Sequence, residues 1–169
     1  EMFQGDRALP KMLVIDEAWD LLRSPEMQAY VVALYRRVRK AGGSVGTITQ
    51  NISDYWLSAS TTAIVDNSAN KYMLKQNGEA INTVEREGRL SLGEWGFQQL
   101  RSVSSVKDAF SEVLCMTDFG TGVGRLVVND FTRLLYTTTP EDVAALKVHR
   151  DRGLNSAQAI YAILKERGL

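Results

Sequence analysis

The stretch KMLVIDEAWDLL, residues 11–22, decides the fold expected for this chain. Its short apolar run at residues 12–15 predicts a buried strand. Two adjacent carboxylates, Asp16 and Glu17, follow the run directly. An apolar strand ending in such a pair is how many nucleotide hydrolases hold magnesium and activate a water molecule, so the stretch raises the question of a phosphate-binding loop elsewhere.

Composition indicates an ordinary globular protein. The chain has 169 residues, 44% of them apolar and 24% charged, which is enough for one compact domain with a core. The zero formal net charge argues against a large nucleic-acid-binding face, though not against a local basic patch. A single cysteine, Cys115, excludes an internal disulfide, and a single histidine, His149, excludes a Cys/His zinc site.

The sequence contains no apolar run near the roughly 20 residues that span a bilayer. No signal peptide is visible, but the chain opens with Glu1, so a fragment could have lost one. A cytosolic compartment fits best.

The first half alternates predicted strands and helices. Ser24 as N-cap and Pro25 in the first turn start a helix that Gly42 and Gly43 end. The remaining predicted elements are a strand at 44–49, a helix at 54–65, a strand at 70–76, and helices at 79–87 and 91–103. This alternation predicts an α/β fold with parallel strands and right-handed crossovers.

The period changes in the second half. Segments 110–116, 124–129 and 133–138 are strand-like and separated by turn residues, which predicts an antiparallel meander. Two terminal helices follow, one from Thr139-Pro140 to Gly153 and one from Asn155 or Ser156.

Ligands of parallel α/β sheets bind beyond the carboxyl ends of the strands. Asp16 and Glu17 follow one predicted strand and Gln50 follows the next, so the three side chains meet if those strands are neighbours. Asp16 can then hold magnesium through water, and Glu17 can orient or deprotonate an attacking water. Gln50 can hydrogen-bond that water or a γ-phosphate and report its presence. The alternative is a capping Asp16, a solvated Glu17 and an ordinary loop glutamine, but the joint placement favours a site.

Other candidate residues have plainer interpretations. The cluster Arg36, Arg37, Arg39 and Lys40 complements a helix C-terminus, although it could also supply an arginine finger or a nucleic-acid patch. His149 is expected to be solvated, Cys115 to lie in the core of a strand, and the tryptophans at 19, 56 and 95 to anchor packing.

The phosphate-binding loop G-x-x-x-x-G-K-[ST] does not occur in the sequence. The glycine-rich stretches GGSVG (42–46) and GTGVG (120–124) lack the Lys-Ser/Thr that must follow. The chain is therefore expected to hold half of an ATPase site, with the other half upstream.

At this point a family resemblance is visible. VIDEAWDLL, the helix closing in RRVRKAGG, and the strand leading into TQN resemble the C-terminal RecA-like domain of type IV secretion and conjugation ATPases, the VirB/TraC class of the FtsK–HerA group. NSANKYMLKQNGEA and GRLVVNDFTRLLYTTTPEDVAAL resemble later segments of that class, closest to its F-like TraC branch.

The resemblance covers nearly the whole chain and implies a single C-terminal portion of the RecA-like domain at 1–169. Residues 1–103 would carry the Walker B and sensor half, and residues 104–169 the antiparallel extension and terminal helices. Asp16 and Glu17 match the Walker B acids, Gln50 the sensor, and Arg39, with Arg36 and Arg37 close behind, an arginine that can act in trans.

The family further implies ATP and Mg²⁺ as cofactors of the intact protein, with neither tightly bound in this chain. It implies a hexameric or other oligomeric enzyme at the cytoplasmic face of the bacterial inner membrane, working in pilus assembly and substrate transfer with other secretion components and a coupling ATPase. Because the phosphate loop does not occur, the chain alone is expected to be inactive.

Two other functions remain open at the level of sequence. Residues 104–169 could dock secretion components while the carboxylates are vestigial, or the chain could belong to a DNA-translocating ATPase of the FtsK–HerA type. An incomplete RecA-like sheet would also expose an apolar edge, so self-association is expected.

Overall fold

The computed structural model describes residue 6 and residues 8–169. The chain divides into two compact units. Unit 1 comprises the described residues up to Ser104 together with Glu112–Gly124, and unit 2 comprises Ser105–Ser111 and Arg125–Leu169. Each unit has buried apolar clusters of its own.

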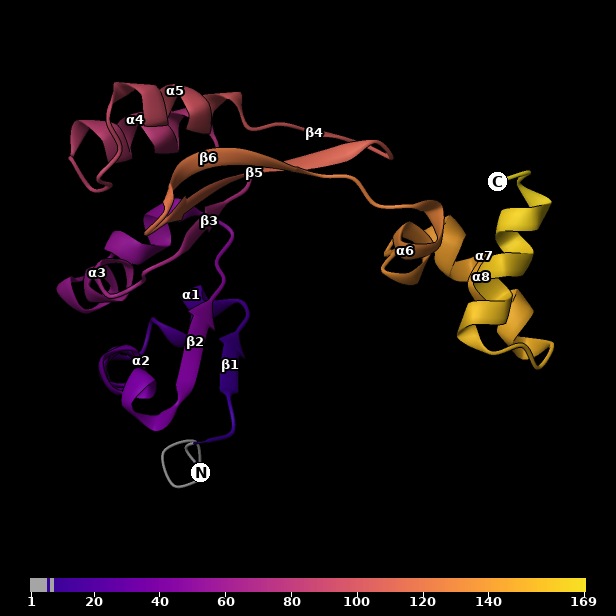
Figure 1. The fold of residues 1–169 in the computed structure, drawn as a ribbon, viewed down its shortest axis with the longest axis horizontal. Helices are drawn as coiled ribbons and strands as arrows, with labels where there is room; N and C mark the ends of the chain where they lie inside the picture. The colour runs from indigo at the N-terminus through magenta and orange to yellow at the C-terminus, as the bar shows by residue number, and fades with distance from the viewer. Residues whose placement is uncertain (1–5, 7) are drawn as a thin grey trace. The chain divides into compact units, whose positions relative to one another are not determined.

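Unit 1 begins with a pair of parallel strands, β1 (Lys11–Ile15) and β2 (Gly43–Thr47), which lie side by side in Figure 1. Three helical segments connect them: α1 (Ala18–Leu21), α2 (Pro25–Arg37) and the 3₁₀ helix η1 (Val38–Ala41). The predicted α/β class and the parallel crossover are thereby confirmed.

Helix α2 starts where capping chemistry predicts. The Ser24 side chain accepts a hydrogen bond from the Met27 N–H at 3.4 Å, and Pro25 occupies the first turn. Val31 and Leu34 are buried, whereas Tyr30 is 54% exposed. The buried stripe passes through Val31 and Leu34, and Tyr30 lies at its margin.

The helix predicted at 54–65 is broken in two. The 3₁₀ helix η2 (Ile52–Trp56) is capped by Asn51, and α3 (Ala59–Asp66) is capped by Ser58. Both caps are capping boxes, in which the cap side chain and the third helical residue exchange hydrogen bonds. The first segment thus ends at Trp56 and Ser58 starts the second, a break that a continuous helical period does not reveal.

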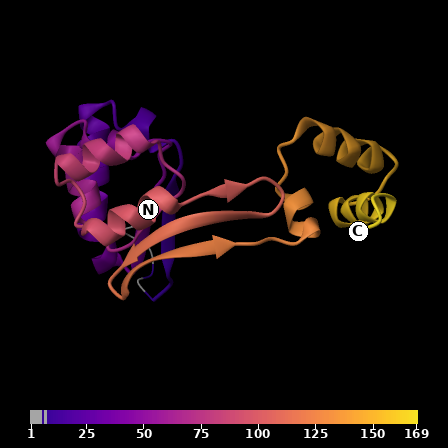
Figure 2. The same ribbon diagram turned by 90° about the horizontal axis from the view of Figure 1, so that it is seen from above.

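The third predicted strand has a different partner from the expected one. β3 (Lys71–Met73) pairs antiparallel with β5 (Phe110–Thr117) rather than parallel with the first two strands. β4 (Ser105–Val106) also pairs antiparallel with β5, and β6 (Gly120–Leu126) pairs with β5 as well. Figure 2 shows β4, β5 and β6 running side by side. β6 starts four residues before the predicted strand because the turn lies at residues 118–119 and the glycines after it are extended.

Helices α4 (Gly78–Arg86) and α5 (Glu94–Ser102) complete unit 1. The helix predicted to start at residue 91 begins later, because Gly93 is the N-cap of α5 and makes no side-chain cap bond. The main core of the unit gathers buried residues from these helices and the antiparallel strands: Ile52, Val65, Met73, Ile81, Val84, Leu90, Phe97, Leu100, Val103 and Leu114.

Unit 2 contains helices α6 (Asp130–Leu135), α7 (Pro140–Asp151) and α8 (Ser156–Glu166). The strand predicted at 133–138 is wrong, because local capping overrides its strand-like composition. Asn129 accepts a hydrogen bond from the Thr132 N–H at 2.8 Å, and Asp130 pairs with Arg133 one turn later at 3.0 Å. Leu134 is thereby buried with two residues of α8, Ile160 and Ile163.

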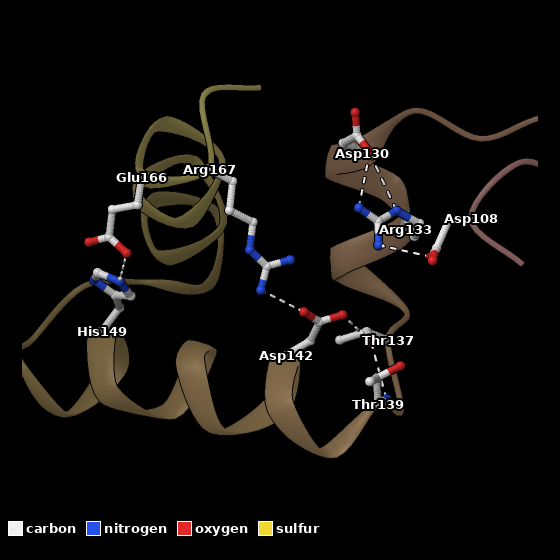
Figure 3. A network of polar contacts seen from close by, with 9 residues as sticks. All are labelled: Asp108, Asp130, Arg133, Thr137, Thr139, Asp142, His149, Glu166 and Arg167. Carbon is white, nitrogen blue, oxygen red and sulfur yellow. Dashed lines mark hydrogen bonds and ion pairs between the residues drawn. The ribbon is translucent and has the colours of Figure 1, made fainter.

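Polar contacts tie α8 to α7, as Figure 3 shows. An Arg167 Nη lies 2.6 Å from Asp142 Oδ1, and the Thr137 hydroxyl donates to Asp142 Oδ2 at 3.1 Å. His149, expected to be solvated, is only 7% exposed, and its Nε2 lies 3.4 Å from Glu166 Oε2. His149 is buried because α7 packs against α8 on that side.

Within the described part of the chain, no helix combines the length and hydropathy needed to cross a membrane.

Candidate functional site

The side chains of Glu17 and Gln50 meet beyond the carboxyl ends of β1 and β2. The Gln50 amide Nε2 donates to Glu17 Oε1 at 2.9 Å and to Oε2 at 3.1 Å. Asp16, directly after β1, accepts the Glu17 N–H on Oδ1 at 2.9 Å. The parallel register, with Ile15 opposite Thr47, places both strand ends at one edge and so brings the three predicted residues together.

The backbone at Glu17 is unusual. Its φ of 50° and ψ of 41° lie in the left-handed region, which costs free energy for any residue with a Cβ. The chain turns here between β1 and α1, while the ladder between the strands continues past it: Ile48 N–H donates to the Ile15 carbonyl and Ala18 N–H to the Ile48 carbonyl, both at 2.9 Å. Strained residues of this kind cluster at functional sites.

The environment of Glu17 favours its ionised form. The hydrogen bond from Gln50 is the largest cause that lowers the pKa of the Glu17 carboxyl, and a hydrogen bond from Trp19 lowers it further. The side chain is exposed, so little desolvation opposes this effect. Glu17 is therefore a carboxylate at neutral pH, which is the state that a general base requires.

The end of β2 is held by a network of hydroxyl groups. Thr47 Oγ1 lies 2.9 Å from the Tyr35 hydroxyl on α2 and 3.0 Å from the Tyr55 hydroxyl on η2. The Tyr55 hydroxyl also donates to the Thr47 carbonyl at 2.9 Å. These bonds fasten the segment that carries Gln50 to two neighbouring elements. These residues could not be predicted from the sequence, since an isolated threonine or tyrosine gives no pattern.

Trp19, predicted to anchor packing, also contacts the Glu17 carboxylate. Its indole Nε1–H donates to Glu17 Oε2 at 2.5 Å. The Arg23 guanidinium lies 4.5 Å from the centroid of the ring. A tryptophan two residues after the acid pair predicts this hydrogen bond only when the left-handed turn at Glu17 is already known.

A shallow hollow of about 430 Å³ adjoins the two acids. It is lined by Ile15, Asp16, Glu17, Asp20, Leu21, Ser24 and Met27. Among the described residues no cluster of three or more His, Cys, Asp or Glu could hold a metal ion by itself. The oxygen donors nonetheless suit Mg²⁺, which keeps several waters and needs only one or two carboxylates when phosphates supply the rest.

The predicted arginine lies elsewhere. Arg39 is exposed on η1, directly before β2, whereas Gln50 follows the end of that strand. Within the described residues, Arg39 therefore does not join Glu17 and Gln50, and the same holds for Arg36 and Arg37 at the end of α2.

One face of the parallel pair is apolar and exposed. Met12 and Val14 on β1 are 71% and 51% exposed, while the alternate residues Leu13 and Ile15 are half-buried. Among the described residues β1 pairs only with β2. Exposed apolar side chains on a strand with an unpaired edge are the feature expected to promote association with another surface.

Comparisons with known proteins place this chain in a family. The family model of the TraG P-loop domain matches residues 3–167. Protein TraC of Escherichia coli (strain K12) is 28% identical over 171 residues, covering 96% of this chain and 19% of TraC. The structure of VirB4 of Thermoanaerobacter pseudethanolicus shares the fold with a TM-score of 0.54 and 24% identity, covering 82% of this chain and 34% of that chain.

The chain thus spans about a fifth of the length of TraC and about a third of the VirB4 chain. The match over nearly all residues confirms the resemblance to the ATPase domains of conjugation and type IV secretion systems. The chain belongs to the TraG P-loop domain family.

Proposed function

We propose that this chain supplies the acidic half of an ATP-hydrolysing site in a type IV secretion or conjugation ATPase. The observation that carries the proposal is the Glu17 carboxylate, placed by a left-handed turn at the end of β1 and held on both oxygens by Gln50. A freely solvated surface glutamate would not be expected to adopt a strained backbone or to accept three N–H contacts.

The three residues have distinct roles in this proposal. Glu17 accepts a proton from the attacking water, because it is ionised and its carboxylate is oriented. Asp16 holds Mg²⁺ through coordinated water at the edge of the hollow. Gln50 reports the γ-phosphate, since any group that competes for its amide weakens its bonds to Glu17. When bound, Mg²⁺ neutralises charge that develops on the phosphates.

The phosphate-binding loop has to come from outside these 169 residues, because their sequence does not contain it. Hydrolysis therefore needs this chain to interact with a second part that carries the phosphate-binding loop. The exposed Met12 and Val14 face supports a role for β1 in contact with such a part.

Arg39 is proposed to act in trans. It lies before β2, at the opposite end of the strand from Gln50, so it could reach a nucleotide only on a neighbouring subunit. This assignment requires an oligomer, and a ring such as a hexamer satisfies it. The intact protein would work at the cytoplasmic face of the inner membrane in pilus assembly and substrate transfer, together with other secretion components.

The decisive experiment replaces Glu17 by glutamine in the intact ATPase that contains this chain. Turnover should fall by roughly 10²–10⁴-fold, while ATP binding persists, because the base is lost and the shape is kept. Glu79→Gln, an exposed change in the first turn of α4, is the matched control and should leave turnover unchanged.

The 169-residue chain alone should show no measurable hydrolysis. Turnover by the chain that Glu17→Gln abolishes would contradict the need for a separate phosphate loop. Full turnover by the intact Glu17→Gln protein would contradict the role of Glu17 and would favour a docking module with vestigial acids.

A further inference from the structure

The indole of Trp19 is a second, independent holder of the Glu17 carboxylate. Its Nε1–H donates to Oε2 at 2.5 Å, while the Gln50 amide contacts Oε1 at 2.9 Å and Oε2 at 3.1 Å. The two donors come from different elements, α1 and the segment after β2. A carboxylate held by one amide can pivot about that contact, whereas two separated donors define its plane.

The indole is itself anchored. Trp19 is half-buried. The Arg23 guanidinium lies 4.5 Å from the ring centroid. The ring contact with Arg23 and the hydrogen bond to Glu17 therefore both orient the indole without any bound ligand.

The contacts on Glu17 leave the carboxylate able to take a proton. A carboxylate offers about four acceptor sites on its two oxygens. Oε2 accepts from both Trp19 and Gln50, whereas Oε1 accepts only from Gln50 among the described residues. Oε1 is thus the oxygen with acceptor capacity for a water molecule, and Trp19 biases the carboxylate toward presenting it.

We propose that Trp19 is a positioning residue for Glu17, whose indole N–H occupies Oε2 and thereby directs Oε1 toward the attacking water. The inference rests on the proposed function for the reaction, but the contact itself does not depend on it. Trp19 touches no reacting atom and acts through the orientation of Glu17.

The contact can be tested in the 169-residue chain by ¹⁵N NMR. Each of the tryptophans at 19, 56 and 95 gives one indole N–H signal, and a Trp19→Phe variant assigns the signal of interest. Glu17→Gln replaces a charged acceptor by a neutral one, so the Trp19 signal should shift while the other two remain. Glu26→Gln, an exposed change on α2, should move none of them.

The consequence can be tested by turnover of the intact ATPase. Trp19→Phe keeps an aromatic ring that can lie beneath Arg23 and removes the N–H donor, so kcat should fall about tenfold with KM within about twofold of the wild type. Trp95→Phe is the control, because Trp95 is 57% exposed on α5 and should leave both constants unchanged.

Each result has a clear meaning. A Trp19 indole signal that ignores Glu17→Gln overturns the contact. A shifted signal together with unchanged kcat in Trp19→Phe overturns the positioning role but leaves the proposed function standing. An intact protein whose turnover is independent of Glu17 overturns the proposed function, and with it the role of Trp19.

Discussion

Replacing Thr47 by valine should loosen the end of β2. The hydroxyl of Thr47 sits between two tyrosine hydroxyls, 2.9 Å from Tyr35 and 3.0 Å from Tyr55. Because the Tyr55 hydroxyl donates its proton to the Thr47 carbonyl, Thr47 Oγ1 donates to Tyr55 and accepts from Tyr35. Valine has the same shape and makes neither bond.

The magnitude follows from the bonds that are lost. A neutral hydrogen bond contributes about 0.5–1.5 kcal/mol net, so losing two should cost about 1–3 kcal/mol. The half-burial of these residues favours the lower part of that range, because water can replace some of the bonding. Tyr35→Phe removes one bond and should cost about 1 kcal/mol, but almost nothing when Thr47 is already valine, giving a coupling of about 1 kcal/mol.

The assay is urea unfolding followed by tryptophan fluorescence. All three tryptophans, at 19, 56 and 95, belong to unit 1, so the signal reports the unit that contains Thr47. With a slope of about 2 kcal/mol per molar urea, the midpoint for Thr47→Val should drop by roughly 0.5–1 M. An unchanged midpoint, or an equal cost of Tyr35→Phe in both backgrounds, would refute the hydroxyl network as the anchor of β2.

Three further changes test other features of the fold. Ser24→Ala removes the acceptor for the Met27 N–H and should lower the stability of unit 1 by about 1 kcal/mol in the same urea assay. Burial raises the pKa of the Tyr55 phenol, so this group ionises at a lower pH in the unfolded chain than in the folded chain. The free energy of unfolding should therefore decline as pH rises above about 10, and Tyr55→Phe should flatten this decline in unfolding curves recorded at alkaline pH. The Arg167 guanidinium lowers the pKa of Asp142, so stability from this pair is present above about pH 4 and lost below it. Asp142→Asn should cost about 1 kcal/mol at pH 7 and remove that acid dependence, measured by hydrogen exchange of α8.

The edge that carries the candidate site could be predicted from local patterns. The apolar run before Asp16 marks β1, and the Ser24-Pro25 signal marks the helix that crosses to β2. Once two consecutive strands are joined by a helix, the right-handed crossover leaves few arrangements other than parallel neighbours. The meeting of Glu17 and Gln50 then follows from strand length, because both strands end at the same level.

The features that escaped prediction depend on partners distant in sequence. β3 has three residues, too few for a pattern that distinguishes parallel from antiparallel pairing. His149 is buried only because α8 covers it. Residues 133–135 are helical because Asn129 caps them from upstream, although their own composition suits a strand.

Glu17 combines a feature that the sequence predicts with one that it does not. Its position after the strand is visible in the sequence, but its left-handed backbone is not, since glutamate rarely adopts that conformation. A carboxylate at this turn requires a residue with a Cβ, which is strained in the left-handed backbone conformation, whereas glycine is not. The same strain should therefore be measurable as a difference between two variants that both lack the carboxylate.

Glu17→Gly and Glu17→Ala provide that comparison, because each loses the contacts with Gln50 and Trp19 and only alanine keeps a Cβ. The free-energy cost of left-handed backbone for alanine is larger than the entropic cost of ordering a more flexible glycine on folding. The glycine variant should therefore have a folded-to-unfolded ratio about fivefold higher. Urea unfolding of the two variants measures the ratio. Equal stability, or a more stable alanine variant, would mean that the turn relaxes once the carboxylate is gone. The hydrogen bonds from Gln50 and Trp19 would then impose the left-handed backbone at Glu17, and the backbone would not be what positions the carboxylate.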